Sequence, residues 1–481
     1  MTARSSSDPS SRIGWLPYIV AATFFMEYLD TTVIATALPQ MAHSFGVGPN
    51  SLSLGMTAYM LALAIFIPVS GWVADRCGSR TVFFSAVVVF TVASVLCGLS
   101  QNVTEFTAAR LLQGMGGAMM VPVGRLIVVR STDKSRMMQA ISTITWPAIA
   151  APVVGPPVGG FITTYASWRW IFLLNVPFGI AVLIAVAAMV PNLRGTERRP
   201  LDVVGLILSA LTLTAILYGA ELASQPTENP WVAVAFIVGG LVAGVIAFQH
   251  AKRHPYPLID VSTLKIPTFS VTVVTGSVTR IGIGAVPYLM PLMFQIGFGM
   301  SAFKSGLLLL ASAVGNLGMK ALTTRILQRF GFRMVSIIDV TVGGIFTIVC
   351  GLLTPEVPLF WVLLVVFVYG VARSMQFSTL ATLAYADVAQ PQMSAASTLW
   401  SAAAQMTIGL GIAFGAVSLR VGAFVHGENT GHAFSLDDFR LAFLFAGVLT
   451  LVSVIGYWGM AHDAGQSVGG GSRRQRTSSG R

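Results

Sequence analysis

The chain has 481 residues, of which 54% are hydrophobic and only 10% are charged. Soluble domains are about one-quarter charged, so this composition excludes an ordinary soluble protein and indicates an integral membrane protein in a lipid bilayer. The net charge of +11 would suggest nucleic-acid binding in a soluble chain, but these basic residues gather in short loops, as expected beside anionic lipid, so we expect no nucleic-acid partner.

Fourteen apolar segments have the roughly 20 residues that a membrane-spanning helix needs. In chain order they cover residues 15–40, 51–74, 81–100, 103–129, 137–162, 169–191, 202–221, 231–250, 267–296, 304–325, 333–354, 357–383, 394–420 and 440–461. The fold class is therefore all-α integral membrane. Most Lys and Arg residues lie in alternate loops, which predicts that both termini face the cytoplasm. We expect a multi-pass protein of a bacterial inner (plasma) membrane.

The spans predict an organisation in five parts. Residues 1–14 are a cytoplasmic N-terminus, 15–191 a six-helix N-terminal bundle, 200–250 a two-helix insert, 267–461 a six-helix C-terminal bundle and 462–481 a disordered cytoplasmic tail rich in Gly, Ser and Arg. A short R-x-x-Q repeat begins at Arg110 and again at Arg373, at equivalent places in the two bundles. Transporters built from parallel repeats have this arrangement.

Two carboxylates, Glu27 and Asp30, interrupt the first span. An unpaired charge in a bilayer costs several kcal/mol, so such acids are functional candidates when a partner is available. At 1.5 Å per residue, Asp30 lies about 12 Å from the outer end of its span and Arg110 about 10 Å from the outer end of the fourth. We therefore predict that Asp30 and Arg110 face each other.

A carboxyl group binds its proton more weakly when a guanidinium is near. Movement of Arg110 relative to Asp30 can therefore couple a proton to a conformational cycle; a permanent ion pair that only fixes helix register is the alternative. Glu27 lies one turn before Asp30 and is predicted to face the same cavity. It would attract a cationic substrate or share the titration of Asp30, unless it is protonated and inert.

The first span of the C-terminal bundle contains Arg280 close to its middle, followed by Gly282, Gly284, Pro287, Pro291 and Gln295. This polar and bendable stretch is predicted to line a cavity or to form a gate. With Glu27 and Gln113, Arg280 and Gln295 are our candidate substrate-binding residues.

The cysteines and histidines do not indicate a metal site. Cys77, Cys97 and Cys350 are odd in number and fit neither a structural disulfide nor a zinc site, and no His-Glu-x-x-His or Walker sequence occurs. We expect no metal, no cofactor and no enzymatic activity.

Gly71-Trp-Val-Ala-Asp75-Arg76-Cys-Gly78-Ser-Arg80 follows the second span. The glycines allow a tight turn between helices. Asp75 can accept from a neighbouring helix N-terminus or pair with Arg76 or Arg80, and such a charge cluster can latch the two halves shut on one side. An ordinary loop rich in basic residues on the cytoplasmic side is the alternative. This stretch resembles the G-x-x-x-D-R-x-G-R-[KR] signature of the major facilitator superfamily, with Ser79 as a departure.

The fifth span contains Ala151-Pro-Val-Val-Gly155-Pro156-Pro-Val-Gly159-Gly160. Its glycines would let another helix approach closely, and its prolines would kink the span. It is similar to the G-x-x-x-G-P-x-x-G-G motif of the antiporter branch of that superfamily. Simple packing of small residues is the alternative.

Residues 27–39, EYLDTTVIATALP, resemble the L-D-x-T-x-x-x-x-A-L-P segment of fourteen-span drug:proton antiporters, the antiporter-2 family of multidrug exporters. The resemblance implies two six-helix bundles plus two additional central helices. It implies proton-coupled export of hydrophobic compounds, with cationic ones as an option, by alternating access.

A metabolite symporter of the same fold and a non-transporting membrane sensor are the alternatives. A small-molecule substrate, protons and the lipid bilayer are the expected partners. We expect a monomer and leave a periplasmic adaptor open.

Overall fold

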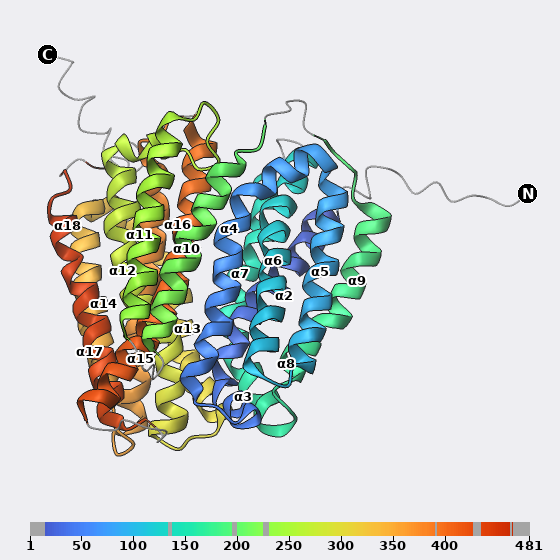
Figure 1. Cartoon of the computed structure of the whole chain (residues 1–481). Coiled ribbons are helices and arrows are strands. Elements are labelled where there is room, and N and C mark those ends of the chain that lie inside the picture. Colours follow the sequence, from blue (N-terminus) through green and yellow to red (C-terminus); the bar gives the residue numbers. More distant parts are fainter. Residues whose placement is uncertain are drawn as a thin grey trace, which may run out of the picture.

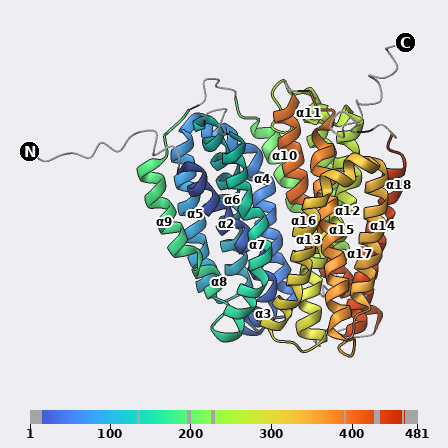
Figure 2. The ribbon, with the colours of Figure 1, turned by 180° about the vertical axis from the view of Figure 1, so that it is seen from behind.

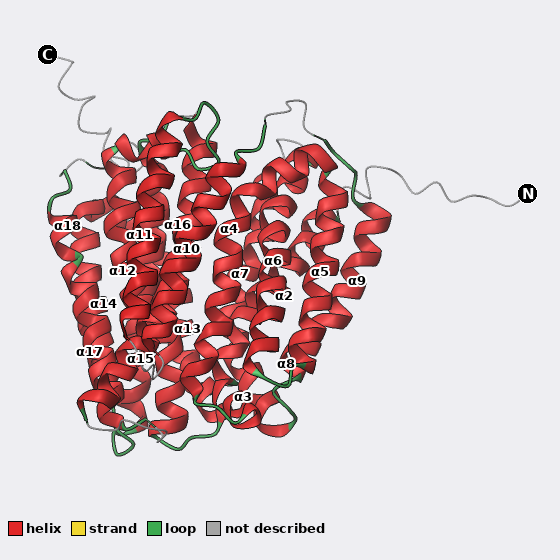
Figure 3. Ribbon diagram, in the orientation of Figure 1, coloured by secondary structure: helices red, strands yellow, loops and turns green. Residues whose placement is uncertain are grey.

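The computed structural model describes residues 15–132, 137–194, 200–224, 230–389, 392–426, 434–461 and 464. Figure 3 shows that helices build this part of the molecule, and no strand occurs within these ranges. The predicted all-helical fold class is confirmed. The predicted terminal segments, 1–14 and 462–481, lie outside the described residues except for Ala464 and so stay predictions.

The N-terminal part forms one group of packed helices, which we call the N bundle (Figure 1). Helices α4 and α5 both pack against α6, and α2 packs against α7. Its helices are α2 (Leu16–Val33), α3 (Leu38–Phe45), α4 (Ser53–Cys77), α5 (Ser79–Leu99), α6 (Val103–Ser131), α7 (Met137–Tyr165), α8 (Trp170–Leu173) and α9 (Asn175–Met189), with 3-10 turns η1 (Ile34–Thr36) and η2 (Pro49–Leu52).

The C-terminal part forms a second group, the C bundle, which meets the N bundle where α13 packs on α7 and α16 packs on α4 (Figure 2). Its helices are α12 (Pro267–Leu292), α13 (Ala302–Phe330), α14 (Phe332–Gly351), α15 (Leu359–Ala386), α16 (Met393–Val425), α17 (Leu436–Val452) and α18 (Val454–Trp458); η3 (Val261–Lys265) precedes α12, and the π-helical turn η4 (Met293–Gly297) continues it.

The two helices between the bundles, α10 (Val203–Ser224) and α11 (Pro230–Arg253), pack mainly on each other. Helix α10 also contacts α4 and α16, so this pair covers the seam between the bundles on one side. Only 17% of the most apolar stretch of α10 and 11% of that of α11 is buried, against 67% for α2. Such apolar, exposed helices are suited to contact with lipid.

Thirteen helices in the described ranges are long and apolar enough to cross a membrane. They correspond to thirteen of the fourteen predicted spans. The remaining predicted span, 137–162, coincides with α7, a 29-residue helix that carries four prolines and includes side chains outside the described set.

Local sequence signals explain where several helices begin. The Asn102 side chain accepts a hydrogen bond from Glu105 N–H at 2.9 Å and starts α6, and Ser435 with Asp438 forms a capping box at the start of α17. We call the end that contains α3 and α8, at the bottom in Figure 1, the outer end. The opposite end, which holds the α4–α5 turn, is the inner end.

Candidate functional site

Asp30 and Arg110 form an ion pair inside the N bundle. Arg110 Nη1 lies 2.5 Å from Asp30 Oδ2, and both side chains are only 1% exposed. The predicted contact between the first and fourth spans is therefore present. It arises because α2 and α6 pack against each other with these residues at matching depths.

Three further polar side chains complete the network around Asp30. Asp30 Oδ1 accepts hydrogen bonds from Gln113 Nε2 at 2.9 Å and from Asn175 Nδ2 at 3.0 Å. Gln113 Oε1 accepts from Arg110 at 2.7 Å, and Ser94 Oγ accepts from Gln113 at 2.8 Å. Both carboxylate oxygens are thus satisfied, which is the arrangement that stabilises an ionised acid in a low-dielectric interior.

Aromatic rings enclose the guanidinium. The Arg110 Cζ lies 4.3 Å from the Tyr59 ring centroid and 5.8 Å from that of Phe172. Such contacts favour a cation by about 2 kcal/mol when water is excluded. The Arg110 Nε makes no hydrogen bond within the described part of the chain. The charge is therefore held by one carboxylate, one amide and ring faces.

Glu27 lies one helical turn inward of Asp30 and is 6% exposed. Its carboxyl carbon would lie 3.4 Å from a Cβ at Gly117, so the small residue on α6 makes room for it. Glu27 Oε2 and the Tyr59 hydroxyl have no hydrogen-bond partner among the described residues. The structure thus places Glu27 beside the ion pair but outside its hydrogen-bond network.

The other predicted substrate-binding residues do not form a single cluster. Gln113 belongs to the Asp30 network. Arg280, 2% exposed on α12, stacks on Trp400 of α16 with its Cζ 3.9 Å from the ring centroid, and its Nε and Nη1 make no hydrogen bond to any described residue. Gln295, in η4, contacts the N bundle instead: its Oε1 accepts from Gln40 at 3.2 Å and its Nε2 donates to Thr36 O at 3.0 Å.

Gln295 is part of a set of contacts that close the outer end between the bundles. Tyr288 of α12 donates to Asn50 Oδ1 at 2.7 Å, and Asn50 Nδ2 donates to Ala416 O at 3.2 Å. Phe303 N–H donates to Thr164 Oγ1 at 3.1 Å. The structure therefore describes a state in which the two bundles are joined at the outer end.

The predicted small-residue motif of α7 makes two close approaches. A Cβ at Gly155 would lie 2.1 Å from Thr32 Oγ1, and one at Gly159 would lie 2.6 Å from Val33 O, both on α2. Gly160 faces the other bundle, where an added Cβ would lie 2.4 Å from Ala302 O.

Pro156 takes part in the same contact with the C bundle. A Cβ at Gly306 of α13 would lie 2.3 Å from Pro156 O. The motif therefore holds α7 between α2 and α13, and no side chain larger than hydrogen fits at these glycines without a shift.

The α4–α5 turn has a different pairing from the predicted one. Asp75 pairs with Arg130 of α6 at 2.9 Å and not with Arg76 or Arg80. Arg76 lies over the Trp72 ring at 5.4 Å, and Arg80 donates to Ala187 O of α9.

Glycines shape this turn. Gly78 adopts φ +95°, a conformation that favours glycine, and an added Cβ there would meet the Asn192 side chain. Gly71 has open space around it. The predicted charge cluster therefore connects helices within the N bundle at the inner end, because α4, α6 and α9 all belong to that bundle.

Sequence reasoning missed several members of the site. Asn175 donates to Asp30 and to Ser94, and Tyr59 stacks on Arg110. Asn175 opens α9 as a lone amide before a long apolar run. Gln40, which contacts Gln295, gave no signal because its partner lies on another bundle.

One group in the described residues has the composition of a metal site: Asp202, His250 and His254, whose ligand atoms lie within 4.8 Å of one another. Asp202 accepts hydrogen bonds from His250 at 2.8 Å, Gly205 N–H at 2.8 Å and Leu258 N–H at 3.1 Å. Burial acts to raise the pKa of Asp202, but these hydrogen bonds outweigh it and lower the pKa below its ordinary value. Asp202 thus caps α10 and anchors the following linker.

Comparison with known proteins places this geometry in a family. Residues 20–416 match the Major Facilitator Superfamily. The chain is 37% identical over 428 residues to the "Putative multidrug resistance protein MdtD" of Serratia proteamaculans (strain 568), covering 87% of each chain. It is 36% identical over 426 residues to the protein of the same name in Cronobacter sakazakii (strain ATCC BAA-894), covering 88% of this chain and 89% of that one.

Solved structures show the same fold at low sequence identity. The POT family transporter PepTSo matches with a TM-score of 0.70 and 11% identity over 93% of this chain and 97% of that chain. The inward-open xylose transporter XylE from E. coli matches with a TM-score of 0.62 and 14% identity over 95% and 99%. The matches in sequence and fold indicate a transporter and not an enzyme, and the chain belongs to the Major Facilitator Superfamily.

Proposed function

We propose that the chain is a proton-coupled antiporter that exports hydrophobic drugs or toxic compounds, cationic ones among them. Two relatives with more than a third of their residues identical are named multidrug resistance proteins, which supports export of such compounds. The observation that carries the proton coupling is the buried Asp30–Arg110 pair with its amide partners Gln113 and Asn175.

The ion pair can exchange a proton for a conformational change. While Arg110 contacts Asp30, both carboxylate oxygens accept hydrogen bonds, which favours the ionised form of a carboxyl group. If the cycle moves Arg110 away, a bare carboxylate in a low-dielectric interior costs several kcal/mol, so Asp30 takes up a proton. Proton release would then accompany the return of Arg110, and the proton leaves to water on the side that is open.

The state described by the structure represents one half of this cycle. The bundles are joined at the outer end through Asn50, Gln295 and Gly160, so substrate would enter from the inner end. Alternating access requires these contacts to break as the bundles rock about a central cavity. The inner end carries Asp75, Arg76, Arg80 and Arg130 and is proposed to face the cytoplasm, in an inner (plasma) membrane.

Glu27 gives the proposed substrate preference. Its carboxyl oxygen without a partner lies near Tyr59, since both side chains approach Gly117, so a hydrophobic cation would find both an acid and a ring face there. A Glu27→Gln variant should therefore lose transport of cations such as tetraphenylphosphonium while retaining neutral compounds. Equal retention of both kinds of compound would contradict this part of the proposal.

Everted vesicles test the proposed function. An inward-acid gradient is formed, a panel of hydrophobic cations and neutral toxins is added, and the internal pH is followed with a fluorescent amine. An antiporter collapses the gradient when substrate is added, a symporter deepens the acidification, and a sensor gives no response.

Variants at the ion pair complete the test. Asp30→Asn and Arg110→Gln should abolish the substrate-dependent response. Asp437→Asn, which removes an exposed acid at the outer end of α17, is the matched control and should respond like the wild type. Proton-dependent export by the Asp30→Asn variant would refute the proposed role of Asp30.

A further inference from the structure

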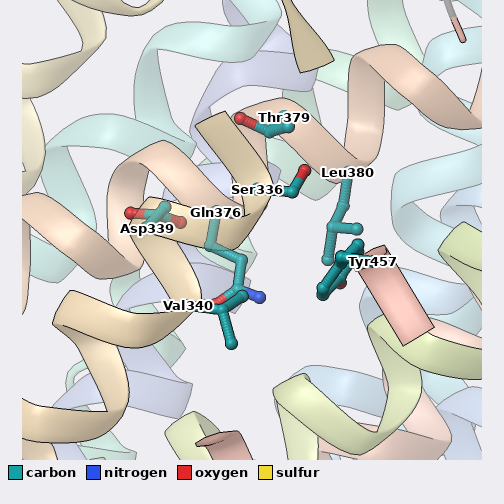
Figure 4. A pocket seen from close by; sticks show the side chains of 7 residues that line it. All are labelled: Ser336, Asp339, Val340, Gln376, Thr379, Leu380 and Tyr457. Atoms are coloured by element: carbon teal, nitrogen blue, oxygen red, sulfur yellow. The ribbon is translucent and has the colours of Figure 1, made fainter. Parts of the chain in front are cut away.

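A second buried carboxyl group lies in the C bundle, away from the Asp30 network. Asp339 on α14 is 7% exposed and lines a pocket shown in Figure 4. Ser336 lies one turn before it, and Gln376 and Thr379, also one turn apart, face them from α15. Tyr457 of α18 and the apolar side chains of Val340 and Leu380 complete the lining.

The polar atoms of this pocket are mostly without partners. Asp339 Oδ2 and the hydroxyls of Ser336 and Thr379 make no hydrogen bond to any described residue. Burying unsatisfied polar groups costs about 1–3 kcal/mol each, and a protonated Asp339 would relieve part of this cost by donating to one of its neighbours.

No positive side chain neutralises Asp339 within ion-pair distance in the described part of the chain. Tyr457 interacts electrostatically with both Asp339 and Arg280. Lys320 on α13 is exposed. The other titratable or charged groups on α14, α15 and α17 are these: Arg333 and Cys350 on α14, Tyr369, half-buried Arg373 and Tyr385 on α15, and Asp437, Asp438 and Arg440 at the outer end of α17.

The size of the pocket selects its occupant. The space between these side chains leaves no room for the centre of a water molecule. A hydrated cation would need at least that room. A proton needs none, and a protonated Asp339 could donate to the carbonyl oxygen of Gln376 or to a neighbouring hydroxyl.

From this pocket we propose that Asp339 is a second proton-binding site, one that takes up and releases a proton during the transport cycle. Asp339 lies about 10 Å from the inner end of its helix, and Asp30 lies about 21 Å from the inner end of α2, at 1.5 Å per residue. The two acids thus occupy different bundles and different depths. The inference rests on the proposed antiport function, because a proton bound at Asp339 contributes to transport only if the protein exchanges protons for substrate.

Ionisation of Asp339 requires the pocket to change shape. The carboxylate has no cation beside it, so its proton can leave only when water or a rearranged α15 reaches the group. The O–H bond of the acid breaks, the proton passes to water at the inner side, and the carboxylate is solvated there. Proton release from Asp339 is therefore tied to movement of α14, α15 and α18 relative to one another.

Infrared difference spectra test the inference without any drug. The full-length protein in detergent is titrated from mildly acidic to mildly alkaline pH, and the C=O band of protonated carboxyl groups is followed. We expect a band at neutral pH that is lost in Asp339→Asn, shifted in Asp339→Glu and unchanged in Asp437→Asn. We also expect it to disappear reversibly as the pH is raised and to be insensitive to exchange of choline chloride for sodium chloride.

Each other outcome overturns the inference. Absence of an Asp339 band at every pH would show that the group is ionised, and a band that never titrates would show an inert buried acid. Displacement of the band by sodium would identify a sodium site. Thermal unfolding of Asp339→Asn and Asp339→Glu verifies that both variants are folded.

The outcome is separable from that of the proposed function. The vesicle response of Asp30→Asn tests antiport, whereas the Asp339 band is measured in the absence of substrate and gradient. If Asp339 titrates and the Asp30→Asn variant is still active, the proposed antiport through Asp30 is refuted and proton binding at Asp339 is supported.

Discussion

Adding one methyl group at the contact between α7 and α13 should open the outer end of the protein. In Gly160→Ala the new Cβ would lie 2.4 Å from Ala302 O, and in Gly306→Ala it would lie 2.3 Å from Pro156 O. Both neighbours are backbone atoms, which cannot swing aside as a flexible side chain does. The clash therefore penalises only the state in which the two bundles touch at this end.

The size of the effect follows from the cost of overpacking. Forcing a methylene-sized group into a close-packed contact costs about 1–3 kcal/mol. Since about 1.4 kcal/mol changes an equilibrium constant tenfold, the population ratio of outer-open to outer-closed protein should rise by roughly 5- to 150-fold. Gly318→Ala is the matched control on α13, because its Cβ would meet nothing within 4 Å.

Labelling of an engineered cysteine measures this shift. Cys77, Cys97 and Cys350 are first replaced, and Gln295→Cys, at a residue only 8% exposed, is introduced at the closed end. A membrane-impermeant maleimide added from the outside should react faster in Gly160→Ala and Gly306→Ala than in Gly318→Ala. Equal rates in all three folded variants would refute the reasoning that these glycines hold the outer end shut.

Two further predictions concern the ion pair and the insert. Asn175→Ala removes one hydrogen bond to a charged oxygen of Asp30, a loss of about 1.5–3 kcal/mol. We therefore expect a lower Tm and a substrate-driven proton movement in vesicles that falls by roughly tenfold or more. A wild-type rate in the folded variant would show that Asn175 does not support Asp30. Asp202→Asn should lower the Tm at neutral pH. Because the pKa of Asp202 is lowered in the folded protein, its stabilisation is present above the ordinary Asp pKa of about 3.9 and is lost as the pH falls through the lower folded value. The Tm difference between Asp202→Asn and wild type should therefore shrink in acid, and a constant difference would contradict it.

The contact between Asp30 and Arg110 could be predicted because it depends on the helical rise per residue, which is constant. Helical rise is constant, so depth in a straight span follows from counting residues, and two opposite charges at equal depth have a strong reason to meet. Gln113 lies one turn from Arg110 on the same face, yet its hydrogen bond to Asp30 was not predicted. The sequence shows which residues share a helix face but not what that face contacts.

The partners of Gln295 and Asp75 depend on how helices are arranged in space. Gln295 lies in a π-helical turn whose extra residue changes the direction of the side chain, and its partners Gln40 and Thr36 O are near only while the outer end is closed. Asp75 pairs across helices with Arg130, while the nearer Arg76 turns to Trp72 and Arg80 reaches α9. Closeness in the sequence favoured pairing of Asp75 with Arg76 or Arg80. The packing of α4 on α6 brings Arg130 to Asp75 instead.

Helix lengths differ from the predicted spans for a related reason. Helix α13 covers Ala302–Phe330, whereas the apolar stretch suggested 304–325, because a helix continues into water when its polar residues still form backbone hydrogen bonds. The first predicted span, 15–40, contains α2, the 3-10 turn η1 and the start of α3. The length of an apolar segment matches the thickness of the bilayer core, but it does not show where an α-helix changes to a 3-10 turn or where it ends.

The hydrogen bonds of Asn50 affect how the helix pair α10 and α11 moves when the two bundles change their relative position. Its single amide nitrogen donates to Ser224 O at the end of α10 and to Ala416 O of α16, while Ser53 next to it binds both carboxylate oxygens of Glu221. When the outer mouth parts, the bond to α16 must be given up, whereas those to α10 can persist. We expect α10 and α11 to move together with the N bundle and to slide over α16 during each transport cycle.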